Sequence, residues 1–144
     1  MTLFDAVKAG DIEKVKLCLG DGKLQIYFFF VTDDDDDFYS NDYNSALHLA
    51  ASFDIKNQIL ELFLSQTKVD VNICFTAEQT NDYIEWTPLH DACHGKATKN
   101  IKTLLAHGAN ILAKNGKGKT PKQLAIDNYA SKELLQLLNN AQKV

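Results

Sequence analysis

Apolar residues recur along the chain at helical spacing, in pairs of short segments joined by tight turns. The first segment of each pair is centred on an alanine, and these alanines are Ala6, Ala50, Ala92 and Ala125. In the second segment the apolar residues lie mostly three or four positions apart, as on one face of a helix. These residues are Ile12, Val15, Leu17 and Leu19; Ile59, Leu62 and Phe63; Ile101, Leu104 and Leu105; and Leu134, Leu137 and Leu138. Neither helix of a pair can bury its apolar face alone, so the pattern predicts stacked helix-turn-helix units.

The alanine-centred segments also share a motif. The clearest copy is TPLHDAC from Thr87, a second is SALHLAA from Ser45, and a weaker one is TPKQLAI from Thr120. The motif resembles that of ankyrin repeats, over nearly the whole chain. The resemblance implies that the threonine caps the first helix, the proline lies in its first turn and the histidine bonds to nearby backbone. The corresponding structural positions are Thr87, Pro88, Leu89, His90, His48, Thr120 and Pro121.

The prediction is therefore an all-α ankyrin-repeat solenoid in a single domain, residues 1–144. Its four units are an N-terminal cap at about 1–22, two full units at 44–72 and 86–114, and a C-terminal cap at 119–143. The steps between the aligned alanines are 44, 42 and 33 residues. The two long steps predict enlarged inter-repeat hairpin loops at 23–43 and 73–85, and the aromatic and β-branched stretch 24–31 favours a short β-strand in the first. Such insertions often border the binding face of a repeat protein.

Charge is divided along the chain, although the formal net charge is only −4. Residues 33–85 hold twelve acidic residues and two lysines, whereas residues 94–144 hold nine lysines and two acidic residues. The chain has no arginine, the preferred residue for phosphate and base-edge contacts, so no nucleic-acid partner is expected. A run of aspartates is either a solvated loop tip or an attractor for a basic patch on a partner: Asp33, Asp34, Asp35, Asp36 and Asp37. A calcium loop would need spaced ligands, a central glycine and a terminal glutamate, which this run lacks.

The expected function is recognition of another protein across the concave face and the long loops. The resemblance implies that the partner contacts variable positions after the paired alanines and before the Thr-Pro turn. These positions are Asn41, Asp42, Asn44, Ser52, Phe53, Tyr83, Ile84, Trp86, His94, Lys117 and Lys119. Two interpretations of Trp86 stay open: an exposed binding residue or a residue packed beneath the long loop. Two alternatives for the function are an inhibitor or host-directed effector that covers a partner's functional surface, and a structural adaptor.

No catalytic, metal or cofactor site is expected. The GKGKT segment at 116–120 has Ala113 where a phosphate-binding loop needs its first glycine. His90, Cys93 and His94 lack a fourth zinc ligand, and Cys93 takes the buried small position of the repeat. The absence of a CxxC spacing, a signal peptide and a membrane span favours an intracellular protein, cytoplasmic or nuclear, and leaves delivery into a host cell open. A monomer is expected in the absence of a partner.

Overall fold

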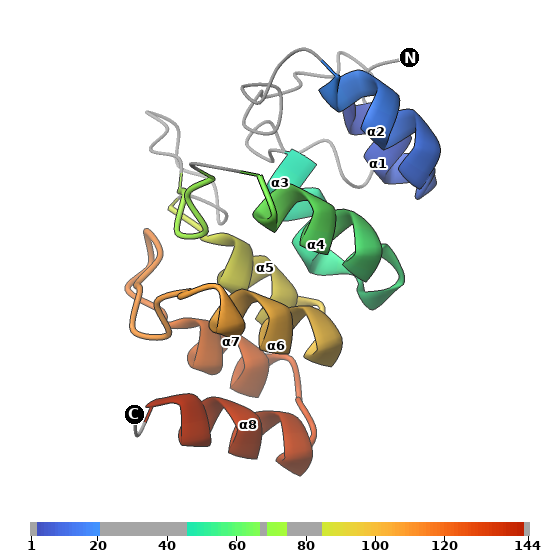
Figure 1. The fold of residues 1–144 in the computed structure, drawn as a ribbon. Coiled ribbons are helices and arrows are strands. Elements are labelled where there is room, and N and C mark those ends of the chain that lie inside the picture. Colours follow the sequence, from blue (N-terminus) through green and yellow to red (C-terminus); the bar gives the residue numbers. More distant parts are fainter. Residues whose placement is uncertain (1–2, 21–45, 67–68, 75–84, 143–144) are drawn as a thin grey trace, which may run out of the picture.

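The computed structural model is a stack of four helix pairs (Figure 1). It describes residues 3–20, 46–66, 69–74 and 85–142. The pairs are α1 (Leu3–Ala9) with α2 (Ile12–Leu19), α3 (Ala46–Ser52) with α4 (Asn57–Leu64), α5 (Pro88–His94) with α6 (Thr98–Ala106), and α7 (Pro121–Asp127) with α8 (Lys132–Gln142). A 3-10 helix, η2 (Asp54–Lys56), joins α3 to α4. The predicted all-α solenoid is confirmed, whereas the loop 23–43 and most of the loop 73–85 lie outside the described residues.

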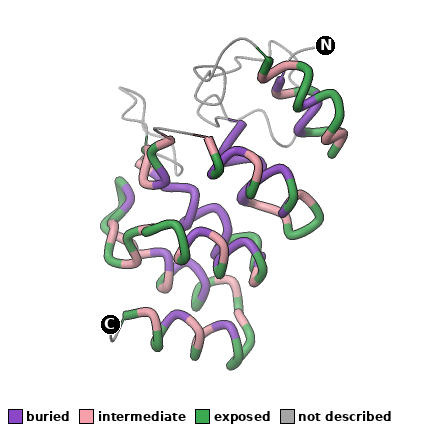
Figure 2. Tube along the Cα trace, in the orientation of Figure 1, coloured by how far each residue is buried: buried purple, intermediate pink, exposed green. Residues whose placement is uncertain are grey.

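The helices form two rows. α1, α3, α5 and α7, the first helices of the pairs, pack side by side in one row, and α2, α4 and α6 follow one another in the second. Burial is greatest on α3 and α5, in the middle of the stack, where residues 46–51 and 88–93 are all buried (Figure 2). The core therefore runs along the stack, between the two rows and between successive units.

Reciprocal hydrogen bonds fix where two of the first helices begin. The Thr87 hydroxyl accepts from the His90 backbone N–H (3.4 Å), and His90 Nδ1 accepts from the Thr87 N–H (3.1 Å). Thr120 and Gln123 make the same pair of bonds at α7, with N···O distances of 3.3 and 2.9 Å. A proline occupies the first turn of each helix, where its missing N–H costs nothing. Glutamine thus takes over the local bond that histidine makes in the preceding unit.

A buried polar network joins the second and third units. The Asn100 side-chain amide donates to three backbone carbonyls at the end of α3, those of residues 50, 51 and 53, over 2.8–3.1 Å. Asn57 Nδ2 donates to Asn100 Oδ1 (2.9 Å), so both amides are bonded. The Asp54 carboxylate accepts from the backbone N–H groups of Lys99 (3.3 Å) and Asn100 (3.0 Å). Asp54 therefore caps α6 from the neighbouring unit, since the N-cap residue of α6 is an alanine.

The turns inside the units require a left-handed backbone. Gly10 has φ +72°, and the residues four positions after the aligned alanines of the last two units, Lys96 and Tyr129, have φ +54° and +58°. Gly108, which follows α6, has φ +87°, a left-handed conformation that favours glycine after the end of a helix. The prediction for Leu17 is wrong: its side chain is 80% exposed, while Val15 is buried. Two residues turn a helix by roughly 200°, so Leu17 points away from the face that carries Val15.

Candidate functional site

Two grooves lie along the row of first helices. The first, here called the polar groove, has a volume of about 230 Å³ and is lined by Trp86, His94, Asn115, Lys117, Lys119, Leu124, Asp127 and Asn128. The second, here called the apolar groove, has a volume of about 340 Å³ and is lined by Phe4, Lys8, Leu49, Phe53, Ile55 and Lys56. The polar groove is formed by α5, α7 and the loop before α7, and the apolar groove by α1, α3 and η2.

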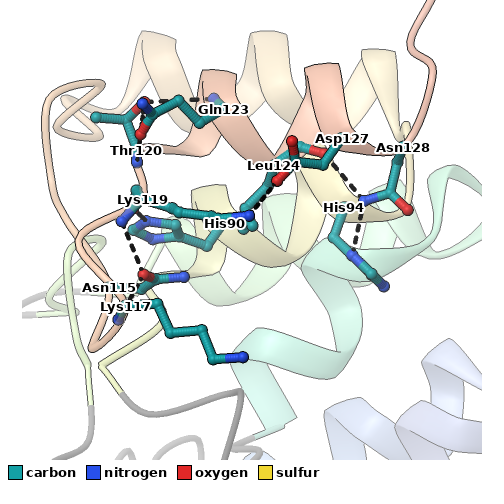
Figure 3. A network of polar contacts seen from close by, with 10 residues as sticks. All are labelled: His90, His94, Asn115, Lys117, Lys119, Thr120, Gln123, Leu124, Asp127 and Asn128. Carbon is teal, nitrogen blue, oxygen red and sulfur yellow. Dashed lines mark hydrogen bonds and ion pairs between the residues drawn. The ribbon is translucent and has the colours of Figure 1, made fainter.

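The loop beside the polar groove is held by its own hydrogen bonds (Figure 3). Asn115, which is 5% exposed, accepts at Oδ1 from the backbone N–H groups of Lys117 and Lys119, both at 3.0 Å. The Asn115 N–H donates to the Lys119 carbonyl (2.9 Å), and His90 Nε2 donates to the same carbonyl (2.9 Å). Since His90 Nδ1 accepts from Thr87, the proton of this ring is on Nε2. A buried asparagine and a repeat histidine therefore set the shape of the loop.

Side-chain contacts join α5 and α7 across the polar groove. Asn128 Nδ2 donates to His94 Nδ1 (3.0 Å), and the two side chains point toward each other in Figure 3. Lys119 Nζ forms an ion pair with Asp127. Partial burial lowers the pKa of His94, which favours the neutral imidazole that this hydrogen bond needs. Lys117 and His94 are exposed, so charged and polar groups line a preformed depression.

Trp86 is not the exposed residue that one of its two interpretations required. It is 7% exposed, and its ring centroid lies 5.3 Å from that of His94 and 6.2 Å from that of His90. Its carbonyl accepts a 2.8 Å hydrogen bond from His48 Nε2, which ties the second unit to the third. Desolvation lowers the pKa of His48 to about 4, so this histidine is neutral at physiological pH. Trp86 is therefore buried at the edge of the polar groove, with the rings of His90 and His94 beside it.

The apolar groove holds Phe53, which is, like Trp86, one of the positions predicted to contact a partner. Phe53 is half-buried against the core beside Phe4 and Leu49. Lys56 Nζ lies 5.2 Å from the centroid of the Phe53 ring and donates to the Lys8 carbonyl (3.2 Å). Ile55, in η2, is 90% exposed. The two aromatic residues thus line different grooves.

The remaining predicted residues are placed as follows. Ser52 donates its hydroxyl to the His48 carbonyl (3.0 Å), one turn back in α3. His94, Lys117 and Lys119 share the polar groove. Seven groups of the prediction lie outside the described residues: Asn41, Asp42, Asn44, Tyr83, Ile84, the run Asp33–Asp37 and the expected strand.

Asp91 is a buried acid that the sequence analysis missed. It is 7% exposed, and Oδ2 is fully buried with no hydrogen-bond partner among the described residues. Burial raises the pKa of this carboxyl well above its usual value. The signal was present in the repeat alignment, because the equivalent residues of the second and fourth units are Leu49 and Leu124, both 6% exposed. Asp91 therefore occupies an apolar position of the stack.

The described part of the chain contains no group of three or more His, Cys, Asp and Glu side chains arranged to hold a metal ion. Cys93 is fully buried, and burial raises the pKa of its thiol to about 12. Within the same residues, every helix is too short or too polar to cross a membrane.

Two comparisons with known protein sequences find similarity to this chain. The family profile of ankyrin repeats (three copies) matches residues 3–115. Ankyrin repeat and SOCS box protein 11 of Danio rerio is 46% identical over 50 residues, which cover 35% of this chain and 17% of that protein. The chain thus spans less than a fifth of the length of this curated relative.

Proposed function

This chain belongs to the ankyrin-repeat family, and we propose that it binds a partner protein through the polar groove and the loop 115–119 beside it. Ankyrin repeats are generally protein–protein interaction modules, and the family is typically non-enzymatic. The observation that carries the proposal is the preformed shape of this loop, which Asn115 and His90 hold next to exposed lysine and histidine side chains.

Preformed structure favours binding because less conformational freedom is lost in the complex. The loop backbone is already bonded at Lys117 and Lys119, and the contact between His94 and Asn128 joins the two walls. A partner would therefore order few backbone groups of this chain. Lys117 places an exposed cation beside the groove, and Lys119 forms an ion pair with Asp127. We expect a partner surface that presents a carboxylate to Lys117 and polar groups to His94.

The acidic run Asp33–Asp37 extends the proposal from the sequence alone. Five consecutive carboxylates attract a basic surface patch and accelerate encounter more than they strengthen the final complex. With lysines in the polar groove, the partner would carry a basic patch and an acidic patch in separate places. We also propose an intracellular location and a monomer in the absence of the partner.

Affinity capture with matched variants tests the proposal. The bait is the whole chain, and the groove variant carries His94→Ala and Lys117→Glu, both at exposed positions. The control, Lys102→Glu, places the same charge change on the exposed surface of α6. We expect a protein that wild type and control enrich and the groove variant loses, followed by at least ~10-fold weaker binding of the purified protein by calorimetry. Equal capture by all three baits would contradict the proposal. The activity of the bound partner then separates an inhibitor, which lowers it, from an adaptor, which leaves it unchanged.

A further inference from the structure

We propose that the apolar groove is a second binding subsite, which takes one apolar side chain from a partner polypeptide whose flanking residues are acidic. The inference rests on the proposed function, since it names part of the partner's chemistry. It concerns different residues, because the apolar groove lies at α1, α3 and η2 and the polar groove at α5, α7 and the loop 115–119.

The size and lining of the groove suit a side chain. Its volume of about 340 Å³ lies at the lower end of small-molecule sites, which span roughly 300–1,000 Å³. Phe4 and Phe53 are half-buried and Leu49 is 6% exposed, so the walls are apolar and already packed against the core. A phenylalanine or leucine side chain would bury its surface there without rearrangement of these residues.

Ile55 is the second observation. Its side chain is 90% exposed at the rim of the groove, so it adds almost nothing to the core. An exposed apolar residue alone is unremarkable, but here it extends the apolar surface of a concave site. It lies next to Lys56 in the three-residue η2, so apolar and cationic groups meet at one edge. This combination predicts a ligand with an apolar anchor and an adjacent negative charge.

The cations at the rim select an acidic flank. Lys56 and Lys8 both line the groove, and among the described residues no carboxylate forms an ion pair with Lys56. Lys56 Nζ uses one N–H on the Lys8 carbonyl and faces the Phe53 ring, while an ammonium has three donors. Because Lys56 is partly buried, desolvation lowers its pKa. A carboxylate from the partner would favour the charged ammonium and fix the direction of the bound segment.

A purely structural role explains only part of this arrangement. The Lys8 carbonyl lies in the last turn of α1, where a cation stabilises the end of a helix. That role accounts for one hydrogen bond of Lys56. It accounts neither for the exposed Ile55 nor for the apolar hollow between the two units.

Fluorescence anisotropy with defined peptides tests the subsite. The probe is a dye-labelled peptide with one phenylalanine between two pairs of glutamates, titrated with the whole chain at low ionic strength, where exposed charges are least screened. One matched probe has alanine in place of the phenylalanine, and the other has lysines in place of the glutamates. We expect the acidic phenylalanine probe to bind at least ~10-fold more tightly than either matched probe.

Two substitutions locate the site. Ile55→Ser and Lys56→Gln should each weaken the acidic phenylalanine probe by roughly 3- to 10-fold. Ile55→Ser changes an almost fully exposed residue, so it should leave the fold intact, which circular dichroism checks. The control Lys102→Gln removes an exposed cation of α6 that lines neither groove and should leave the affinity for the probe unchanged.

Several outcomes would overturn the proposal: no binding of the acidic phenylalanine probe, equal binding of a matched probe, or wild-type affinity in both Ile55→Ser and Lys56→Gln. Binding that occurs only after Asp33–Asp37 are replaced with asparagine would also overturn it, because the occupant would then be the chain's own acidic stretch. Probe binding without any Lys117-dependent partner would support the subsite and contradict the proposed function of the polar groove. A Lys117-dependent partner without binding of the acidic phenylalanine probe would contradict the subsite alone.

Discussion

Replacing Asp91 with leucine should stabilise the protein. Asp91 is 7% exposed, and its Oδ2 has no hydrogen-bond partner among the described residues. The equivalent positions of the flanking units hold Leu49 and Leu124, both buried in the same row of helices. Leucine therefore suits this position of the repeat, and Asp91→Leu removes a buried polar group without creating a cavity.

The expected gain in stability comes from removing a buried carboxyl oxygen that has no hydrogen-bond partner among the described residues. A buried acceptor without a partner costs about 1–3 kcal/mol relative to a satisfied one. Burial of the added methyl groups contributes a further ~1–2 kcal/mol, and imperfect packing of the larger side chain opposes it by a similar amount. We expect Asp91→Leu to raise the free energy of unfolding by about 2 kcal/mol. For a chain of this length, that is a rise in Tm of roughly 6 °C.

The pH dependence identifies the cause. The pKa of Asp91 is raised in the folded state, so above its usual value of 3.8 the unfolded chain is ionised while the folded chain keeps the proton. The unfolded state then binds fewer protons, and the stability contributed by Asp91 falls as pH rises through this range. His48 acts in the opposite direction: its folded pKa is about 4 instead of 6.5, so its contribution rises with pH between these values. The two effects oppose each other in wild type.

Urea denaturation followed by circular dichroism between pH 4 and pH 7 measures the free energy of unfolding and its dependence on pH. In Asp91→Leu the opposing effect of Asp91 is gone, and the effects of His48, His90 and His94, whose folded pKa values are all lowered, remain. Stability should therefore rise with pH more steeply than in wild type between about 4 and 6.5. Asp91→Asn is the control, because it removes the titration but keeps the volume and a buried polar group. Asp91→Asn should show the same steeper rise of stability with pH, but a smaller increase in the free energy of unfolding at pH 7 than Asp91→Leu. A variant Asp91→Leu no more stable than wild type at pH 7, or an unchanged slope in both variants, would refute the reasoning.

Three further substitutions probe the contacts between and within units. Asn100→Ala should lower the free energy of unfolding by about 3 kcal/mol in urea denaturation, since the buried carbonyls of residues 50 and 51 lose this donor and the bond to residue 53 is lost as well. A loss below ~1 kcal/mol would contradict this role. Gly95→Ala should lower the Tm measured by scanning calorimetry, because an added Cβ would lie 2.3 Å from the Ser52 carbonyl oxygen; an unchanged Tm would show that α3 and α5 can separate freely. Tyr129→Gly should raise the free energy of unfolding by about 1 kcal/mol, because φ is +58° and the side chain is 92% exposed. Tyr129→Ala keeps the backbone strain and should not stabilise the protein. Equal stability of the two variants would argue against strain.

Much of the fold could be predicted because its signals are local. The alanine-centred segments and the spacing of apolar residues define helices, and a Thr-Pro pair defines where a helix begins. The cap at Thr120 kept its geometry although glutamine replaces histidine, since both side chains can accept from the same backbone N–H. The apolar face of α2 was predicted wrongly at Leu17, because a residue two positions from Val15 cannot lie on the same face of a helix.

Less of the candidate site could be predicted, because it depends on contacts between units. His94, Lys117 and Lys119 were expected from their repeat positions, and they line one groove. Trp86 is buried beside two histidines of α5, and Phe53 lies in a separate groove formed with α1 and η2. Neither fact is contained in the local spacing of either aromatic residue.

The sequence by itself determined the repeat, the helices and their caps, because hydrogen bonds and apolar periodicity over a few residues specify them. Tertiary structure decided which side chains the neighbouring units cover. It buried the carboxyl of Asp91 in an apolar row, and it set the Asn100 amide against carbonyls about 50 positions earlier in the chain. Exposure and hydrogen-bond satisfaction are properties of the packed stack, so only the stack distinguishes a binding residue from a packing residue.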